Sequence, residues 1–301
     1  MQFKKSIFSV IAALLLLGMA LLPAIFRVTS RTDLVGPDLS SFKYEEVEFH
    51  NGDLKLAGLI FTPESEGPFP VAVIIHESGP SRRNNQWYLS VTRHLQDSGI
   101  VVLLPDKRGC EKSEGNWVGA NFDDLAGDTL AAVDFARNRG DFDSSKIGLI
   151  GMSQGGWIAP VAAAEDDDIS FVVSMSGSTV TTDQQLLHEE IHNISEYTWP
   201  FVARLLAPMT TKKIQRMDHF QPMSGFDPIP YWKRVNAPKF FAFGENDSNV
   251  SVQDSVEVLQ ANAIGGLMKI CPNGGHAIAD IKTHAVQDAF LDDLVEFIGQ
   301  P

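Results

Sequence analysis

Short apolar runs with strand character recur along most of this 301-residue chain. Pro70–Ile75 is continuously apolar, which is typical of a strand buried on both faces of a sheet. Further strands are expected at Gly99–Leu104, Ile147–Ile150, Ile169–Met175, Lys239–Phe243 and Leu267–Cys271. The pattern therefore predicts a sheet with a buried centre.

The first strands have a different pattern. Tyr44–His50 alternates between acidic and apolar positions, and Leu54–Phe61 follows it after Asn51 and Gly52. An Asn-Gly pair between two strands favours a type I′ turn, because both residues tolerate positive φ. An antiparallel hairpin is therefore expected at the N-terminal edge of the sheet.

Helical segments separate most of the later strands. They are expected at Asn85–Ser98, Phe122–Arg137, Trp157–Ala164, Val252–Ala263 and Val286–Ile298. Strands that alternate with helices after an opening hairpin indicate the α/β class, with a mostly parallel sheet and an antiparallel N-terminal hairpin.

One interval breaks this alternation. Between Gly177 and Lys239 there is no strand signal, only helix-prone pieces and a cluster of aromatic residues. Ligands of open α/β folds bind beside the carboxyl ends of the strands. We therefore predict a helical cap, inserted at about residues 179–236, over that edge of the sheet. A surface excursion without contact to a ligand is the alternative.

The first 30 residues differ from the rest of the chain. Lys4 and Lys5 precede Ile7–Phe26, which has no charged residue and is close to the length that spans a bilayer. Residues 1–30 are therefore predicted to be a signal peptide or an N-terminal membrane anchor. The protein is expected to be exported to the periplasm or another extracytoplasmic compartment, with residues 31–43 as a linker and residues 44–301 as one α/β domain.

Charge and cysteine content exclude some partners. With 24 basic and 38 acidic residues the net charge is −14, which argues against nucleic acid and anionic membrane surfaces. Membrane contact is therefore expected only through the N-terminal segment. Cys110 and Cys271 follow strands that lie several positions apart in the expected sheet, so both are predicted to be free thiols without a metal or redox role.

The segment Lys146–Gly156 carries the clearest functional signal. Its apolar run ends in Gly151-Met-Ser153-Gln-Gly155, and a segment of helical composition follows. Glycines on both sides of a serine allow a sharp turn that lifts the hydroxyl above the sheet, at the N-terminus of the next helix. Ser153 is therefore a candidate nucleophile, and a plain turn between strand and helix is the alternative.

A serine hydroxyl needs a base to take its proton and a third group to orient that base. Two loops that follow later strands offer these groups. Residues 243–250 contain Glu245 and Asp247, and residues 272–277 contain His276 after two glycines. The serine, the acids and the histidine thus follow one another in the chain, each at the carboxyl end of an expected strand.

With this order of residues, the chain resembles the α/β hydrolases of the serine esterase, prolyl-oligopeptidase-like and dienelactone-hydrolase-like group over about residues 44–299. The matching segments are His76–Pro80, Asp106–Ser113, Gly151–Gly156, Gly244–Val250 and Gly274–His276. The resemblance implies an α/β-hydrolase fold, with Ser153 as nucleophile, His276 as general base and Asp247 as the orienting acid. Asp247 is preferred to Glu245 because it matches the family's Gly-x-x-Asp-x-x-Val pattern.

An acyl-transfer site also needs N–H groups directed at the oxygen that becomes negative. Gln154, directly after the nucleophile, is expected to supply one, and Ser78 the second, with Gly79 as the alternative. The family usually has glycine directly after His76, whereas this chain has Glu77. This departure puts a carboxylate near the expected oxyanion hole.

Two other features match functional patterns less completely. His188-Glu-Glu-Ile-His192 fits the His-Glu-x-x-His zinc motif, but no third ligand follows at the spacing of the longer motif. We interpret it as a coincidence and expect no metal and no cofactor. Arg82 and Arg83 follow the oxyanion loop, where an arginine can meet a substrate carboxylate, but solvated surface is their expected role.

Together these residues predict a serine hydrolase that cleaves carboxylic esters through an acyl-enzyme, with a small-molecule ester or a short peptide as substrate. A serine peptidase of the aminopeptidase or acyl-peptidase type, using the same residues, is the main alternative. Esters are preferred because no substrate-gating domain is expected before the catalytic one. A non-catalytic binding protein on the same scaffold is the other alternative, which the complete Ser, Asp and His set disfavours.

Overall fold

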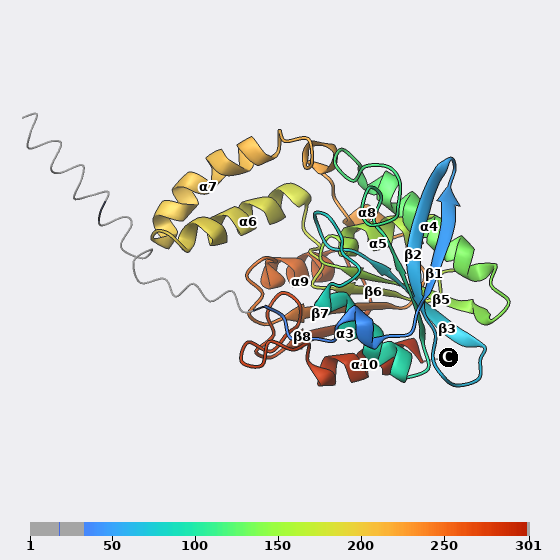
Figure 1. Ribbon diagram of the computed structural model, residues 1–301. Coiled ribbons are helices and arrows are strands. Elements are labelled where there is room, and N and C mark those ends of the chain that lie inside the picture. Colours follow the sequence, from blue (N-terminus) through green and yellow to red (C-terminus); the bar gives the residue numbers. More distant parts are fainter. Residues whose placement is uncertain (1–17, 19–32, 300–301) are drawn as a thin grey trace, which may run out of the picture.

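The computed structural model describes residues 33–299 together with residue 18, and it shows an eight-stranded sheet with helices on both faces (Figure 1). The strands are β1 (Glu45–Asn51), β2 (Leu54–Phe61), β3 (Phe69–Ile75), β4 (Val101–Pro105), β5 (Phe142–Met152), β6 (Val172–Met175), β7 (Lys239–Gly244) and β8 (Leu267–Cys271). Their order in the sheet is β1-β2-β4-β3-β5-β6-β7-β8. The β1–β2 and β2–β4 pairings are antiparallel, and the pairings from β4 through β8 are parallel. The predicted mostly parallel sheet with an antiparallel N-terminal hairpin is confirmed.

Helices bury both faces of the sheet. One face is covered by α3 (Gln86–Asp97) and α10 (Asp288–Ile298), and the other by α4 (Phe122–Arg137), α5 (Gly155–Ala163) and α9 (Val252–Ala261). Val73 of β3 enters the layer of α4 and α5, whereas its neighbours Ala72 and Ile74 enter the layer of α3 and α10. Since both faces of β3 are buried, its sequence is apolar at consecutive positions.

The N-terminal hairpin forms where expected, but its turn differs from the prediction. Asn51 pairs with Leu54, so the turn consists of Gly52 and Asp53. Of these two residues Gly52 has a positive φ, of 57°, and Asp53 does not, whereas a type I′ turn needs two positive values. The type I′ prediction is therefore wrong. The strand continues through Asn51, whose amide donates to Asp128 over 2.8 Å.

The chain makes a helical excursion between β6 and β7, in the region where the sequence predicts a cap. It contains α6 (Thr182–Ser195), α7 (Pro200–Ile214), the 3-10 turn η2 (Gln221–Met223) and the short α8 (Ile229–Trp232). Reciprocal hydrogen bonds between Thr181 and Gln184 form a capping box, which sets the start of α6. In Figure 1, α6 and α7 lie side by side and project from the body of the protein.

Residues 33–43, which the sequence predicts as a linker, lie against the body of the protein. Asp38 caps a 3-10 turn at Leu39–Ser41, and Phe42 is buried against Phe61, with ring centroids 5.2 Å apart. The predicted signal peptide or anchor at residues 1–30 lies outside the described residues except for residue 18. Among the residues that are described, no helix is long and apolar enough to cross a membrane.

The expectations for the cysteines and for the two arginines have different outcomes. Cys110 and Cys271 are buried free thiols, as predicted. Arg82 is exposed, but the expectation of solvated surface is wrong for Arg83. The Arg83 side chain is 11% exposed, and its guanidinium donates two hydrogen bonds, of 2.8 and 2.6 Å, to the carboxylate of Asp106. This ion pair joins the loop after β3 to the loop after β4.

We expect Arg83→Met to lower the free energy of unfolding by about 3–5 kcal/mol. The substitution leaves the carboxylate of Asp106, whose side chain is 1% exposed, buried without its charged partner. Urea unfolding followed by circular dichroism measures the effect. Arg82→Met is the matched control, because Arg82 is the exposed neighbour. Equal losses in the two variants would show that the ion pair is not the cause.

Candidate active site

Ser153 occupies the sharp turn between β5 and α5. Its φ of 52° lies in the left-handed region, which costs about 1–3 kcal/mol for a residue with a side chain. The Ser153 N–H donates to the carbonyl of Met175 on β6 over 2.9 Å, which holds the turn. A Cβ at Gly151 would lie 2.2 Å from the carbonyl oxygen of Gly155, and a Cβ at Gly155 would lie 2.3 Å from that of Ile75. The turn therefore requires both glycines.

Three side chains from separate strand ends form one series of hydrogen bonds. Nε2 of His276 lies 2.9 Å from Oγ of Ser153, and Nδ1 lies 2.9 Å from Oδ2 of Asp247. Because a carboxylate only accepts hydrogen bonds, Nδ1 carries the proton of the neutral ring, and Nε2 can accept from the serine hydroxyl. This arrangement can take a proton from Ser153 and stabilise the imidazolium that results.

The loop after β7 decides which of its two acids meets the imidazole. The side chain of Asp247 is fully buried, at 0% exposed, and its Oδ1 accepts from the N–H groups of Asn249 and Val250 over 2.9 and 3.0 Å. Glu245 is exposed and accepts instead from the N–H of Asn273 over 3.1 Å. Of the two acids, Asp247 is the one in contact with the imidazole.

The surroundings of His276 favour its protonated form. Burial lowers its pKa, but the hydrogen bond to Asp247 and the charge of that carboxylate outweigh burial. The charges of Glu77 and Glu189 act in the same direction, so the pKa of His276 lies above its ordinary value of 6.5. The ring also packs edge-on against Trp87, with centroids 5.5 Å apart. The site is thus suited to hold an imidazolium.

The loop after β3 lines the same cavity as Ser153. Ser78 and Gln154, the two expected N–H donors, are both among the lining residues. Nζ of the buried Lys107 donates to the carbonyls of Glu77 and Gly79, the latter over 2.7 Å, and thereby holds the loop. Because the N–H of a trans peptide points opposite to its carbonyl, the Ser78 N–H points away from this amine. Burial lowers the pKa of Lys107 to about 8.

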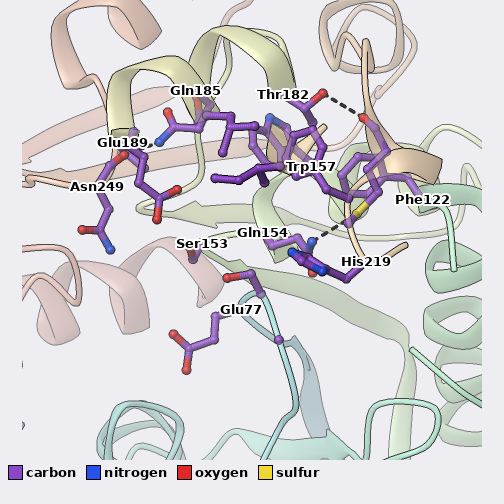
Figure 2. A pocket seen from close by; sticks show the side chains of 18 of the residues that line it. Glu77, Phe122, Ser153, Gln154, Trp157, Thr182, Gln185, Glu189, His219 and Asn249 are labelled. Atoms are coloured by element: carbon purple, nitrogen blue, oxygen red, sulfur yellow. Dashed lines mark hydrogen bonds between the residues drawn. The ribbon is translucent and has the colours of Figure 1, made fainter. Parts of the chain in front are cut away.

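Glu77, the departure from the family pattern, is bound by the start of α3. Its Oε1 accepts from Nδ2 of Asn85 over 2.8 Å and from the hydroxyl of Tyr88 over 3.3 Å. In Figure 2 the carboxylate points away from Ser153. The carboxylate that replaces a glycine therefore has hydrogen-bond donors of its own, on the far side of the loop from the serine.

These side chains surround a cavity of about 530 Å³. α6 contributes Thr182, Gln185, Leu186, Glu189 and Glu190, the segment after α7 contributes His219, Phe220 and Met223, and other apolar lining comes from Trp117, Phe122, Leu125 and Trp157. In Figure 2 the residues of α6 lie on one side of Ser153, and Glu77 of the loop after β3 lies on the other. The predicted cap region thus lines the cavity that contains the serine.

Sequence reasoning does not identify the α6 residues that face this cavity. Thr182, Gln185 and Glu189 recur at the spacing of one helical face, and this periodicity is the signal from which they could be found. Glu189 is partly buried, and burial raises its pKa. Lys107 also goes unidentified, because nothing in its local sequence shows that its amine reaches the loop after β3.

The zinc-like motif of α6 does not place its histidines in the cavity. His188 and His192 are absent from the lining, whereas Glu189 and Glu190 between them belong to it. Nε2 of His192 lies 4.0 Å from Glu196. Within residues 33–299 and at residue 18, no group of three or more His, Cys, Asp or Glu side chains is arranged to hold a metal ion.

The strand order, the serine turn after β5, the acid after β7 and the histidine after β8 together define the α/β-hydrolase fold. Solved structures share it. An esterase of Pyrococcus furiosus superposes with a TM-score of 0.64 at 21% identity, over 89% of this chain and 95% of its own. An acylaminoacyl peptidase of Pyrococcus horikoshii superposes with a TM-score of 0.63 at 17% identity, over 85% of this chain and 41% of its own.

Within this fold class the chain belongs to the prolyl oligopeptidase family, whose model matches residues 83–300. A curated relative is the esterase EstD of Thermotoga maritima, which is 25% identical over 253 residues. The aligned region covers 76% of this chain and 58% of that esterase. The chain thus spans little more than half the length of this relative. The resemblance that its motifs indicate is confirmed.

Proposed function

We propose that the protein is a serine hydrolase that cleaves carboxylic esters. The observation that carries the proposal is the series of hydrogen bonds from Ser153 through His276 to Asp247, at the wall of a cavity with room for a small substrate. The family and the esterase relative support the same class of reaction.

In the proposed reaction, Nε2 of His276 takes the proton of Ser153 as Oγ attacks the carbonyl carbon of the ester. The N–H groups of Gln154 and Ser78 donate to the oxygen that becomes negative in the tetrahedral intermediate. The imidazolium then protonates the leaving oxygen, an alcohol departs, and the acyl group remains on the serine. Water, deprotonated by the same imidazole, releases the acid and restores the hydroxyl.

A peptidase that uses the same residues is the second candidate, and one observation favours it. Glu189 and Glu190 of α6 both line the cavity. Carboxylates near a reacting carbonyl attract a protonated amine, such as the N-terminus of a short peptide. A substrate with an amino group close to the scissile bond therefore suits this cavity, whether that bond is an ester or an amide.

A fluorophosphonate probe tests for an activated serine, and we expect it to label the protein at Ser153. Turnover of p-nitrophenyl esters of increasing acyl length is then compared with turnover of aminoacyl p-nitroanilides. Faster turnover of the esters supports the first candidate, and faster turnover of the amides supports the second. Absence of labelling would contradict both.

We also propose that the protein is exported, and is either released or held at a membrane by its N-terminal segment. The support is the uncharged run Ile7–Phe26 after two lysines. Cell fractionation with an antibody to the folded domain tests this, and recovery of the full-length chain from the cytosol would contradict it.

The acidic limb of the kcat/KM profile is expected above pH 6.5. Only the neutral imidazole of His276 accepts the serine proton, and its pKa is raised above that value. Glu189→Gln removes one of the charges that raise this pKa, so the limb should move to lower pH. Glu190→Gln is the matched control, because Glu190 is the neighbouring carboxylate on the same cavity wall, whereas the pKa of His276 is raised by Asp247, Glu77 and Glu189.

A neutral ester serves for these pH profiles, so that the substrate does not titrate. A limb that stays in place in Glu189→Gln, or that moves equally in Glu190→Gln, would contradict the assigned electrostatics.

A further inference from the structure

α7 and the residues directly before and after it concentrate apolar surface. Of the thirteen large apolar side chains exposed in the described part of the chain, seven lie between residues 197 and 217. They are Tyr197 (52% exposed), Trp199 (45%), Phe201 (71%), Leu205 (76%), Leu206 (42%), Met209 (71%) and Met217 (36%). Exposed apolar side chains gathered on one element mark a contact surface.

This surface is the outer face of α7. Ala203 and Ala207 are buried and form part of the face that packs on α6. Phe201, Leu205 and Met209 recur at the same four-residue interval on the opposite side of the helix. In Figure 1, α6 lies between α7 and the body of the protein, so the outer face of α7 is turned to solvent.

The same stretch is basic. Its exposed cations are Arg204, Lys212, Lys213 and Arg216. Residues 197–217 contain no Asp or Glu, although Glu196 and Asp218 flank them. The net charge of the whole chain is −14, whereas the charge of this stretch is positive. The positive charge lies on the same element as the exposed apolar side chains. By helical spacing, Lys212 lies on the same outer side of α7 as Leu205, and Arg216 follows two residues after the helix ends.

We propose that the outer face of α7, with Tyr197 and Trp199 before it, docks on an anionic lipid bilayer. Aromatic side chains are favoured at the level of the headgroups, apolar side chains enter the acyl boundary, and adjacent cations attract anionic lipid. Salt screens charges more than about 8 Å away, so the cations of α7 dominate at this face. The proposal departs from the expectation that rested on the total charge of the chain.

A bilayer suits this face better than a second copy of the chain. Two copies that met through α7 in a symmetric dimer would bring their cations together, and like charges across an interface disfavour association. Anionic headgroups complement the same cations. The expected anchor at Ile7–Phe26 would also keep α7 at high effective concentration near a membrane.

The test compares two labelled positions in the full chain, reconstituted with vesicles. Cys110 and Cys271 are buried, so a thiol-directed, environment-sensitive fluorophore reacts at an introduced cysteine. Leu205→Cys places it on α7, and Glu64→Cys places it in the β2–β3 loop, at a side chain that is 85% exposed. An N-terminal anchor would hold the two labelled variants on the vesicles equally. A difference in fluorescence between the labels at 205 and 64 therefore measures the contact of α7 with the bilayer.

With phosphatidylcholine vesicles that contain about a quarter phosphatidylglycerol, we expect the label at 205 to shift to the blue and to brighten, and the label at 64 to stay unchanged. Replacing Arg204, Lys212 and Lys213 of α7 and the following Arg216 by glutamine should reduce the response at 205 by roughly fivefold or more. The charge-matched control replaces exposed lysines elsewhere, at Lys43, Lys146, Lys233 and Lys282, and should retain the response.

Three results would overturn the proposal. The first is a label at 205 that stays as exposed to water as the label at 64. The second is an equal response with phosphatidylcholine alone, which would remove the role of the cations. The third is a response that depends on protein concentration without vesicles, which would assign this face to a second copy of the chain.

Discussion

Replacing Ser153 by alanine is expected to lower kcat for a p-nitrophenyl ester by roughly 10⁶-fold and to leave the fold intact. The variant lacks the oxygen that the proposed acyl-enzyme requires, while the imidazole and its carboxylate remain in place. Alanine keeps the backbone N–H that bonds to Met175, so the turn is retained. Initial rates and a circular dichroism spectrum measure the two effects.

Ser78→Ala is the matched control for this experiment, because Ser78 lines the same cavity and its proposed role belongs to the peptide N–H. It should retain activity close to that of the parent protein. Turnover that survives in Ser153→Ala, or that disappears equally in Ser78→Ala, would contradict the assignment of the nucleophile.

Asp247→Asn is expected to lower kcat by about 10⁴-fold. The carboxylate of Asp247 accepts from Nδ1 of His276 over 2.9 Å and so presents Nε2 to the serine. An asparagine amide can donate to Nδ1 instead, which would put the proton on Nε2 and leave the ring unable to take the serine proton. The loss should persist at every pH at which the protein is folded, since a tautomer change is not a titration.

Glu245→Gln tests the other acid of the same loop. Glu245 is exposed and accepts from a backbone N–H, and it makes no contact with the imidazole. Activity near that of the parent protein is expected. If Glu245→Gln loses as much activity as Asp247→Asn, the loop acts as a whole, and the orienting role cannot be assigned to Asp247.

The fold was predictable where a local pattern encodes it. Pro70–Ile75 is apolar at consecutive positions because both faces of β3 are buried. Gly151 and Gly155 surround a serine because neighbouring backbone leaves no room for a Cβ. Features of this kind depend on a few adjacent residues. The positions of the strands and of most helices, and the family, could therefore be predicted from the sequence.

Side-chain directions were less predictable, because they depend on segments that meet only in the folded protein. The sequence around Arg83 does not show that Asp106, at the end of another strand, accepts its hydrogen bonds. The direction of Glu77 likewise depends on Asn85 and Tyr88 of α3. The cavity-facing side of α6 was predictable only in part. The periodicity of the helix showed which residues share a face, but the sequence did not show that this face borders the cavity that contains Ser153.

The contact between Gly155 and Ile75 also bears on how this protein can diverge. Gly155 belongs to the turn that carries Ser153, and Ile75 is the last residue of β3, after which the loop with Glu77 and Ser78 begins. A side chain at position 155 would clash with the backbone carbonyls of Ile75 and His76. The turn that carries Ser153 and the loop after β3 therefore cannot shift independently of each other. Variation in substrate preference is therefore expected to accumulate in α6 and the segment after α7, whose residues line the cavity around Ser153.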